Sequence, residues 1–377
     1  MRKIVKRLFE LNLPRGQSAF LWGPRKVGKS FWIHHQLPHA TIIDLLQTDC
    51  FVEYAARPAL LRERFADTPG IIVIDEIQKI PSLLDEVHWL IARAGKQFLL
   101  TGSSARKLRR GHANLLGGRA WKRHMVPLSV QEVEGFDLER AMQSGLLPSH
   151  FLSSHPAEEL RAYIADYLKE EIAAEALIQN IPAFSEFLKV AALTSSELLN
   201  YTNVGREAGV SAKVVRNYFQ ILEDTYLGFR IPPWKKSRTR RLIETEKFYL
   251  FDVGVTNFLA RRTPRIGTPE FGKSFEHYIL MELLAFKAYR QPDTEIAFWR
   301  TSNQHEVDFL LNDKEIAIEI KASNRVHEGD LKGLKALLED GPVKRAYIVC
   351  LESRRRKIDK RFEVVPWREF ISELWNS

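Results

Sequence analysis

The sequence has little cysteine and no long apolar segment. Two of its 377 residues are cysteine, and Cys50 and Cys350 stand far apart with no metal-binding pattern around them. This spacing argues against a zinc site and against a disulfide framework. No uninterrupted apolar run approaches the roughly 18 residues that a membrane helix needs, and no apolar signal core follows the basic N-terminus. We therefore expect a cytoplasmic protein that does not associate with membranes.

The length and the charge of the chain favour several domains and a polyanionic partner. A chain of 377 residues is too long for one compact core, so we expect two to four domains. The formal net charge is +9, which favours a polyanion such as nucleic acid. Basic residues gather in four stretches, each of which on its own is more often a solvated surface: 106–110, 119–123, 235–241 and 354–357.

A glycine-rich stretch carries the clearest chemical signal. Residues 23–30 read Gly23-Pro24-Arg25-Lys26-Val27-Gly28-Lys29-Ser30, the pattern G-x-x-x-x-G-K-[ST]. The stretch follows an apolar run and precedes a helical pattern, the context in which backbone N–H groups surround a phosphate at the positive end of a helix. Lys29 is predicted to reach the outer phosphates and Ser30 to bind Mg²⁺. The alternative is a glycine-rich turn that only resembles such a loop.

Two further apolar runs end in polar residues. The run at 71–74 ends in Asp75 and Glu76, and the run at 97–100 ends in Thr101, followed by further hydroxyls. The carboxyl ends of parallel strands open onto one crevice, so these residues should meet there. Asp75 is predicted to hold Mg²⁺ directly or through water, and Glu76 to orient and deprotonate the attacking water. Thr101 is predicted to contact the terminal phosphate and this water. We expect another strand at 41–45 and a helix at 80–94.

Arg119 is a further candidate for the same site. It follows two glycines, Gly117 and Gly118, and an arginine in that setting could point at a γ-phosphate, either its own or that of a neighbouring subunit. An ordinary surface arginine is the alternative.

The middle of the chain resembles a winged helix-turn-helix. Short helices are predicted at 195–201 and 204–208, and a longer one at 212–225, with a Ser211 cap. Wing strands are predicted at 226–231 and 242–243. A DNA reader of this kind would use the following side chains, the first three in a groove and the last three on phosphates: Lys213, Arg216, Asn217, Lys235, Lys236 and Arg238. A protein-contact or lid module is the alternative.

Two alternating strands mark the C-terminal part. They are predicted at 305–311 and 315–321 around a turn at 313–314, which places Asp308 opposite Glu319. Lys321 falls on the same face as Glu319. Two acids and a lysine on one face can hold a divalent metal and position a water for phosphodiester cleavage, and Glu276 could add a carboxylate. A salt-bridged hairpin is the alternative.

Together these motifs resemble a widespread family of bacterial and archaeal ATP-binding proteins. In that family an AAA-type P-loop ATPase is followed by a winged-helix segment and a domain similar to the PD-(D/E)XK, or restriction-endonuclease-like, nucleases. The resemblance covers nearly the whole chain and rests on residues 23–30, 74–79, 100–104, 117–119, 127–129, 247–254, 275–276, 306–309 and 319–321. It implies ATP as the nucleotide, Mg²⁺, and a homo-oligomer in which one subunit's arginine completes the neighbour's site. Ser30 stands where the family usually has threonine.

We therefore expect an α/β fold with four parts. These are an AAA-type P-loop sheet with helices on both faces at 1–128, a helical lid or connector at 129–185, a winged helix-turn-helix at 186–243, and an α+β restriction-endonuclease-like domain at 244–377. The predicted function is ATP hydrolysis coupled to DNA binding, with metal-dependent DNA cleavage as a second activity. The alternative is an ATP-dependent switch that acts on a protein partner, with an inert nuclease-like domain. A small-molecule kinase is disfavoured, because no phospho-acceptor site is visible.

Overall fold

A computed structural model describes most of the chain in two compact units. The described residues are 4–106, 108, 116–165, 167, 178, 180–236, 242–358 and 360–376. The N-terminal unit comprises Ile4–Leu128 and Ile221–Leu227. The C-terminal unit comprises Ser129–Gln220 and Gly228–Ser377. Over the described ranges, no helix combines the length and the apolar character that crossing a membrane requires.

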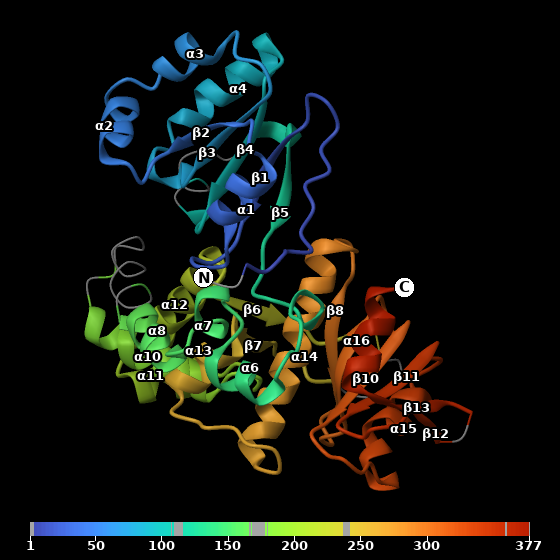
Figure 1. Ribbon diagram of the computed structural model, residues 1–377. Coiled ribbons are helices and arrows are strands. Elements are labelled where there is room, and N and C mark those ends of the chain that lie inside the picture. The colour runs from blue at the N-terminus through green and yellow to red at the C-terminus, as the bar shows by residue number, and fades with distance from the viewer. Residues whose placement is uncertain are drawn as a thin grey trace. The chain divides into compact units, whose positions relative to one another are not determined.

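A five-stranded parallel sheet forms the centre of the N-terminal unit (Figure 1). The strands are β1 (Ser18–Trp22), β2 (Thr41–Asp44), β3 (Ile71–Asp75), β4 (Gln97–Gly102) and β5 (Ala120–His124), in the order β2-β3-β4-β1-β5. The first four are the predicted apolar runs. Every residue of β1 is buried, as are the last four of β3, so both faces of the sheet are covered, as in other parallel sheets.

The helices of the N-terminal unit connect these parallel strands. They are α1 (Lys29–Gln36), α2 (Thr48–Ala56), α3 (Leu60–Phe65) and α4 (Leu83–Ala94). The predicted helices after the glycine loop and at 80–94 are therefore confirmed, although α4 begins three residues later. One face of α4 buries Leu83, Val87 and Leu90 in the same apolar core as Phe20 and Leu100, as its helical spacing of apolar residues predicts.

The C-terminal unit begins with helices. They are α6 (Leu138–Ser144), α7 (Pro148–Phe151), α8 (Pro156–Ala162), α10 (Ile181–Leu193), α11 (Tyr201–Ala208), α12 (Ala212–Asp224, whose last residues belong to the N-terminal unit) and α13 (Val253–Leu259). The predicted long helix is α12, and Val214 N donates to the Ser211 hydroxyl at 3.4 Å, as the predicted cap requires. The helix predicted at 195–201 is wrong. Ser196 has a left-handed φ of 73°, and Asn200 caps α11 by accepting from Asn203 N.

A short hairpin follows α12. Strand β6 (Gly228–Ile231) pairs antiparallel with β7 (Lys247–Leu250). The predicted wing strand at 242–243 is wrong, because Leu242 forms an antiparallel bridge with Thr301 instead. The predicted wing residue Arg238 lies outside the described residues.

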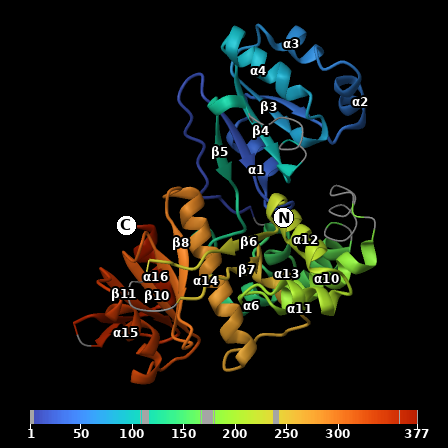
Figure 2. The ribbon, with the colours of Figure 1, turned by 180° about the vertical axis from the view of Figure 1, so that it is seen from behind.

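A six-stranded mixed sheet completes the C-terminal unit. Its strands, in the order β12-β13-β11-β10-β9-β8, are β8 (Ile296–Arg300), β9 (Glu306–Leu311), β10 (Ile316–Lys321), β11 (Arg345–Cys350), β12 (Arg356–Ile358) and β13 (Phe362–Pro366). The accompanying helices are α14 (Pro269–Tyr289), α15 (Lys332–Glu339) and α16 (Trp367–Trp375). Figure 2 shows α14 running beside this sheet. Ile316 pairs with Leu311 and Ile318 with Phe309, which confirms the predicted register of the β9–β10 hairpin.

Candidate nucleotide-binding site

The predicted phosphate-binding loop joins buried strand β1 to helix α1. A Cβ at Gly23 would lie 2.2 Å from the Met125 carbonyl oxygen, so this close approach requires glycine. Gly28, with φ of 100°, is left-handed directly before the helix. The buried Lys29 ammonium donates to the carbonyl oxygens of Gly23 at 2.7 Å and Pro24 at 3.1 Å. Burial lowers the pKa of Lys29, and Asp75 and Glu76 oppose that shift. The lysine charge thus lies inside the loop.

The predicted magnesium ligands lie together. Ser30 Oγ donates to Asp75 Oδ2 at 2.7 Å, and the Thr101 hydroxyl donates to the other oxygen of the same carboxylate. Asp75 is buried at the carboxyl end of β3. A hydroxyl and a carboxylate beside a phosphate-binding loop are the hard oxygen ligands that Mg²⁺ takes. The donor set of Ser30 and Asp75 therefore fits this ion.

Glu76 is held next to that pair. Its backbone is left-handed, with φ of 58°, a conformation uncommon for a residue with a side chain. The amide of Gln78 donates to its carboxylate, as does Ser103 Oγ at 3.2 Å. Its own backbone N–H points at Thr101 Oγ1, 3.4 Å away. The sequence assigns roles to Glu76 and Thr101 but none to Gln78, which it marks only as part of the motif at 74–79.

A buried arginine that lies outside residues 23–30 donates hydrogen bonds to the glycine loop. The Arg7 guanidinium donates to the carbonyl oxygens of Val27 at 2.5 Å and Val126 at 2.6 Å. Val27 is buried, whereas Lys26 is exposed and left-handed, with φ of 61°. Arg7 thus ties the loop to the segment that follows β5. No sequence pattern marks this arginine, because its partners are backbone atoms distant in the chain.

Arg119 lies away from this cluster. Strand β5 runs parallel to β1, with Ala120 opposite Ser18 and His124 opposite Trp22. Arg119 is exposed and directly precedes β5, so it lies at the edge where the strands begin, about 13 Å or more from the loop at a rise of about 3.3 Å per residue. The interpretation that it reaches the phosphate of its own subunit is therefore wrong. A role at a neighbouring subunit stays a prediction.

The C-terminal acids and lysine do lie near one another. Lys321 Nζ is 2.6 Å from Glu319 Oε1, and Asp308 Oδ2 accepts from Ile320 N at 2.7 Å. Burial raises the pKa of Asp308 well above its usual range, and repulsion by Glu319 adds to the shift. Burial also raises the pKa of Glu319 to about 7.

A second lysine, missed by sequence reasoning, belongs to the same cluster. Lys247 Nζ lies 2.6 Å from Glu306 Oε1 and 3.3 Å from Glu276 Oε1. Among the residues that the structure describes, no group of three or more His, Cys, Asp or Glu side chains is arranged to hold a metal ion. The Lys247 ammonium thus bonds Glu276, the carboxylate predicted to add to the metal site, and competes there with a divalent ion.

The predicted DNA-binding residues differ in their surroundings. Lys213, Arg216 and Asn217 are exposed on α12, and the Arg216 guanidinium lies 5.0 Å from the centre of the Tyr201 ring. Lys235 is exposed, whereas Lys236 Nζ forms an ion pair with Asp313 at 2.7 Å. The exposed face of α12 is thus the better surface for a polyanion.

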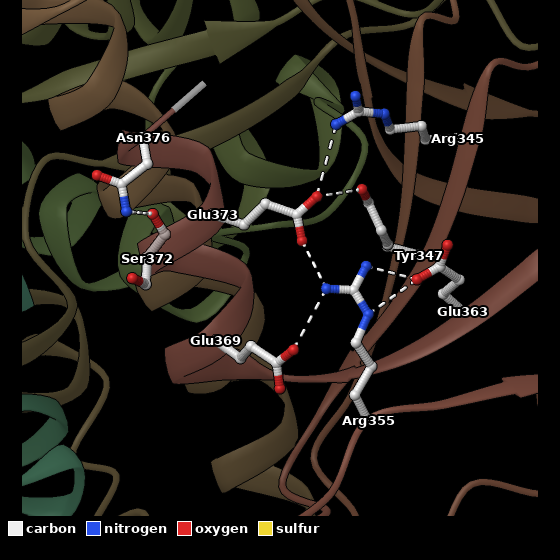
Figure 3. A network of polar contacts seen from close by, with 8 residues as sticks. All are labelled: Arg345, Tyr347, Arg355, Glu363, Glu369, Ser372, Glu373 and Asn376. Atoms are coloured by element: carbon white, nitrogen blue, oxygen red, sulfur yellow. Dashed lines mark hydrogen bonds and ion pairs between the residues drawn. The ribbon is translucent and has the colours of Figure 1, made fainter.

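Two of the four basic residues at 354–357 form ion pairs, and Figure 3 shows those of Arg355. The Arg355 guanidinium bonds three carboxylates: Glu363 at 2.5 Å, Glu373 at 2.7 Å and Glu369 at 3.2 Å. Arg356 pairs with Glu352 at 2.8 Å. These two arginines therefore belong to structural ion pairs, and the hypothesis that they bind a polyanion is not supported.

The sheet order, the glycine loop and the contact of Ser30 with Asp75 define a P-loop NTPase-like module of the α/β class. Comparison with known families agrees: residues 15–134 match the model of an AAA domain. The remaining parts match two domains of unknown function, DUF8612 over residues 135–265 and DUF4143 over residues 271–370. The N-terminal unit is thus AAA-type, and the activity of the other two matched segments is not described by their families.

Several relatives align along nearly the whole chain. Uncharacterized proteins of Mycobacterium bovis and Mycobacterium tuberculosis are each 24% identical over 375 residues, covering 96% of this chain and 82% of their own length. An uncharacterized protein of Methanocaldococcus jannaschii is 22% identical over 378 residues, covering 90% of this chain and 82% of its own. Among solved structures, C. elegans PCH-2 aligns with a TM-score of 0.25 and 12% identity, covering 56% of this chain and 61% of that one.

Proposed function

We propose that the N-terminal unit binds ATP with Mg²⁺ and hydrolyses it to ADP and phosphate. The observation that carries this proposal is the 2.7 Å contact between Ser30 Oγ and Asp75 Oδ2 at the end of the glycine loop. Lys29 and Glu76 lie buried beside it. The match of residues 15–134 to an AAA domain supports the same activity.

Each residue has a distinct part in this proposal. The backbone N–H groups of residues 23–30 bind the phosphates at the positive end of α1. Lys29 exchanges its neutral carbonyl partners for charged phosphate oxygens, which are stronger acceptors. Ser30 and Asp75 would hold Mg²⁺, which neutralises charge on the phosphate oxygens when bound. Glu76 takes the proton of the water that attacks the γ-phosphate, and Thr101 and Ser103 keep the two acids oriented.

Two substitutions separate binding from chemistry. Lys29→Ala removes the cation from the loop, so we expect ATP affinity to fall by about 100-fold or more in calorimetric titration. Glu76→Gln keeps the shape but cannot accept the proton, so we expect normal ATP binding and phosphate release slower by about 10²- to 10⁴-fold. Glu63→Gln, on exposed α3 of the same unit, is the matched control. Undiminished turnover by Glu76→Gln would remove Glu76 from its assigned role.

We propose that Arg119 acts at the nucleotide site of a neighbouring subunit in a homo-oligomer. Because β5 places this residue at the sheet edge opposite the glycine loop, it can complete only the site of another subunit. Arg119→Ala and Lys29→Ala should each be inactive alone. In a mixture of the two proteins, some sites would combine an intact loop with an intact arginine, so we expect partial recovery of ATP turnover. No recovery in a mixture that sedimentation shows to be co-assembled would contradict a shared site.

We propose further that the C-terminal unit acts on DNA through α12. The exposed Lys213, Arg216 and Asn217 and the net charge of +9 support this part. If several phosphates are bound, affinity should fall steeply between roughly 50 and 200 mM salt, because counterions are released on binding. Fluorescence anisotropy with labelled duplex, single-stranded and branched DNA measures this dependence.

A matched pair of variants locates the DNA surface. Arg216→Ala on α12 should weaken DNA binding and reduce its salt dependence by about one unit of slope. Lys335→Ala removes a positive charge on α15 instead of α12, so it should change neither the DNA affinity nor its salt dependence. Absence of any DNA affinity at low salt would favour the alternative, a nucleotide-operated switch that acts on a protein partner.

DNA cleavage by Asp308, Glu319 and Lys321 is not part of the proposed activity, because a lysine of the chain already bonds the neighbouring carboxylates Glu276 and Glu306. Incubation of the full chain with DNA and Mn²⁺ tests this directly, and we expect intact substrate. Cleavage that disappears in Asp308→Ala would restore the nuclease hypothesis.

A further inference from the structure

Four carboxylates of the C-terminal unit lie close enough to interact, and two of them line a polar cavity. Glu276 comes from α14, Glu306 and Asp308 from β9, and Glu319 from β10. Glu276 and Glu306 line a cavity of about 670 Å³, together with Lys247. Repulsion by Glu319 and Glu276 contributes to the raised pKa of Asp308, after burial. So many acids at close range require a cation or protons.

The cation is supplied by the chain itself. Lys247 is 3% exposed, and its ammonium bonds Glu306 at 2.6 Å and Glu276 at 3.3 Å. The ammonium also lies 5.4 Å from the centre of the Phe298 ring. Position 247 is fixed by the β6–β7 hairpin, where Ile231 pairs with it. The backbone of Lys247 is therefore held by strand pairing, and its side chain is buried.

The remaining acids have their own partners. Glu319 bonds Lys321 at 2.6 Å, and Arg300 bonds the second oxygen of Glu306 at 3.1 Å. Asp308 accepts from the backbone N–H of Ile320 at 2.7 Å. The three cations Lys247, Lys321 and Arg300 thus face four carboxylates. The cluster approaches neutrality without any further ion.

We infer that the Lys247 ammonium is the resident cation of the carboxylate cluster formed by Glu276, Glu306, Asp308 and Glu319, and that it takes the place that a divalent metal would need. A divalent ion among these oxygens would have to approach a fixed positive charge that already bonds two of them, and the two cations repel one another. The C-terminal unit accordingly takes no Mg²⁺ or Mn²⁺ at this cluster. Replacing the ammonium by a neutral side chain of similar length converts the cluster into a site for a divalent cation. This inference is independent of the ATPase proposal.

The experiment measures Mn²⁺ binding to the full chain without nucleotide, by calorimetry and by the loss of the free-ion paramagnetic resonance signal. Lys247→Met keeps the length of the side chain and removes its charge. Lys273→Met removes a lysine that lines the same cavity but bonds Glu197, outside the cluster, and is the matched control. Glu306→Gln in each background locates the ion.

We expect Lys247→Met to bind one Mn²⁺ more than the wild type, with an affinity at least about tenfold above any background binding. The additional site should disappear in Lys247→Met/Glu306→Gln, and Lys273→Met should behave as the wild type. A cooperatively folded Lys247→Met protein that gains no site would overturn the inference.

The wild-type chain provides a second test that needs no stable Lys247 variant. If the cluster takes no divalent ion, then Glu306→Gln and Asp308→Asn should leave Mn²⁺ binding unchanged up to about 1 mM, the range of weak protein sites. A wild-type Mn²⁺ site that either substitution abolishes would show that the ammonium does not exclude the metal, and the inference would fail.

Discussion

The buried carboxyl of Glu282 should make the stability of the C-terminal unit depend on pH. Ser129 Oγ donates to Glu282 Oε2 at 2.6 Å, and Val130 N and the Tyr278 hydroxyl donate to Oε1 at 2.8 and 2.9 Å. Burial raises the pKa of Glu282 to about 7, although these bonds oppose the shift. Ser129 directly follows Leu128, where the N-terminal unit ends. The carboxyl therefore anchors the first residues of the C-terminal unit.

The sign and size of the effect follow from proton linkage. The folded chain keeps a proton that the unfolded chain releases above its ordinary pKa of 4.5. The protonated Glu282 carboxyl therefore contributes its full stabilisation of the folded chain below about pH 4.5, and this stabilisation is lost as the pH rises through about 7. A pKa difference between 4.5 and about 7 corresponds to roughly 3 kcal/mol. Glu282→Gln can keep the three hydrogen bonds, because the Ser129 hydroxyl can rotate to accept, but it does not titrate.

Urea denaturation of the full chain at about pH 4.5, 6 and 8, followed by circular dichroism, measures this linkage. Relative to the wild type, the free energy of unfolding of Glu282→Gln should rise by roughly 3 kcal/mol between the lowest and highest pH. Glu158→Gln changes the same charge on exposed α8 and should follow the wild type. If the free energy of unfolding changes with pH in the same way for the wild type and for Glu282→Gln, the reasoning is refuted.

Three further substitutions test the packing around the nucleotide site. Gln78→Ala removes a donor from Glu76, so ATP turnover should fall by about tenfold with ATP affinity unchanged, as compared in turnover and titration assays. Gly102→Ala places a Cβ 2.3 Å from Gln78 Oε1, and the strain should lower stability by about 1–3 kcal/mol in urea denaturation. Arg106→Met breaks the buried ion pair with Asp224 at 3.1 Å, which should cost about 3 kcal/mol. Asp224→Asn in the same background should restore part of that loss.

The nucleotide site could be predicted because its residues follow local rules. A buried parallel strand, a glycine loop and a helix leave a continuous sequence pattern, and the carboxyl ends of parallel strands necessarily meet. The sequence alone therefore predicts that Lys29, Ser30, Asp75, Glu76 and Thr101 meet, and in the structure hydrogen bonds link Ser30, Asp75, Thr101 and the backbone of Glu76.

The position of Arg119 could not be predicted in the same way. It depends on the direction of β5, and this edge strand, Ala120–His124, is too polar to show as an apolar run. The position of Lys247 beside the carboxylates was not predicted, for a related reason. It approaches Glu306 only through the pairing of distant segments, and the sequence pattern placed the second strand of the wing elsewhere.

The two lysine and carboxylate clusters of this chain differ in what their ammonium groups contact, and this difference decides what each can bind. Lys29 donates to neutral carbonyl oxygens of its own loop. A phosphate offers that ammonium a charged acceptor, so ligand binding improves its hydrogen bonds. Lys247 already bonds the carboxylates of Glu306 and Glu276. Any ligand that recruited this ammonium would break its ion pairs with two half-buried acids, of which Glu306 would keep only Arg300 and Glu276 would keep no cation among the residues that the structure describes. The first cluster is therefore open to an anion, whereas the second is already satisfied by the chain's own charges.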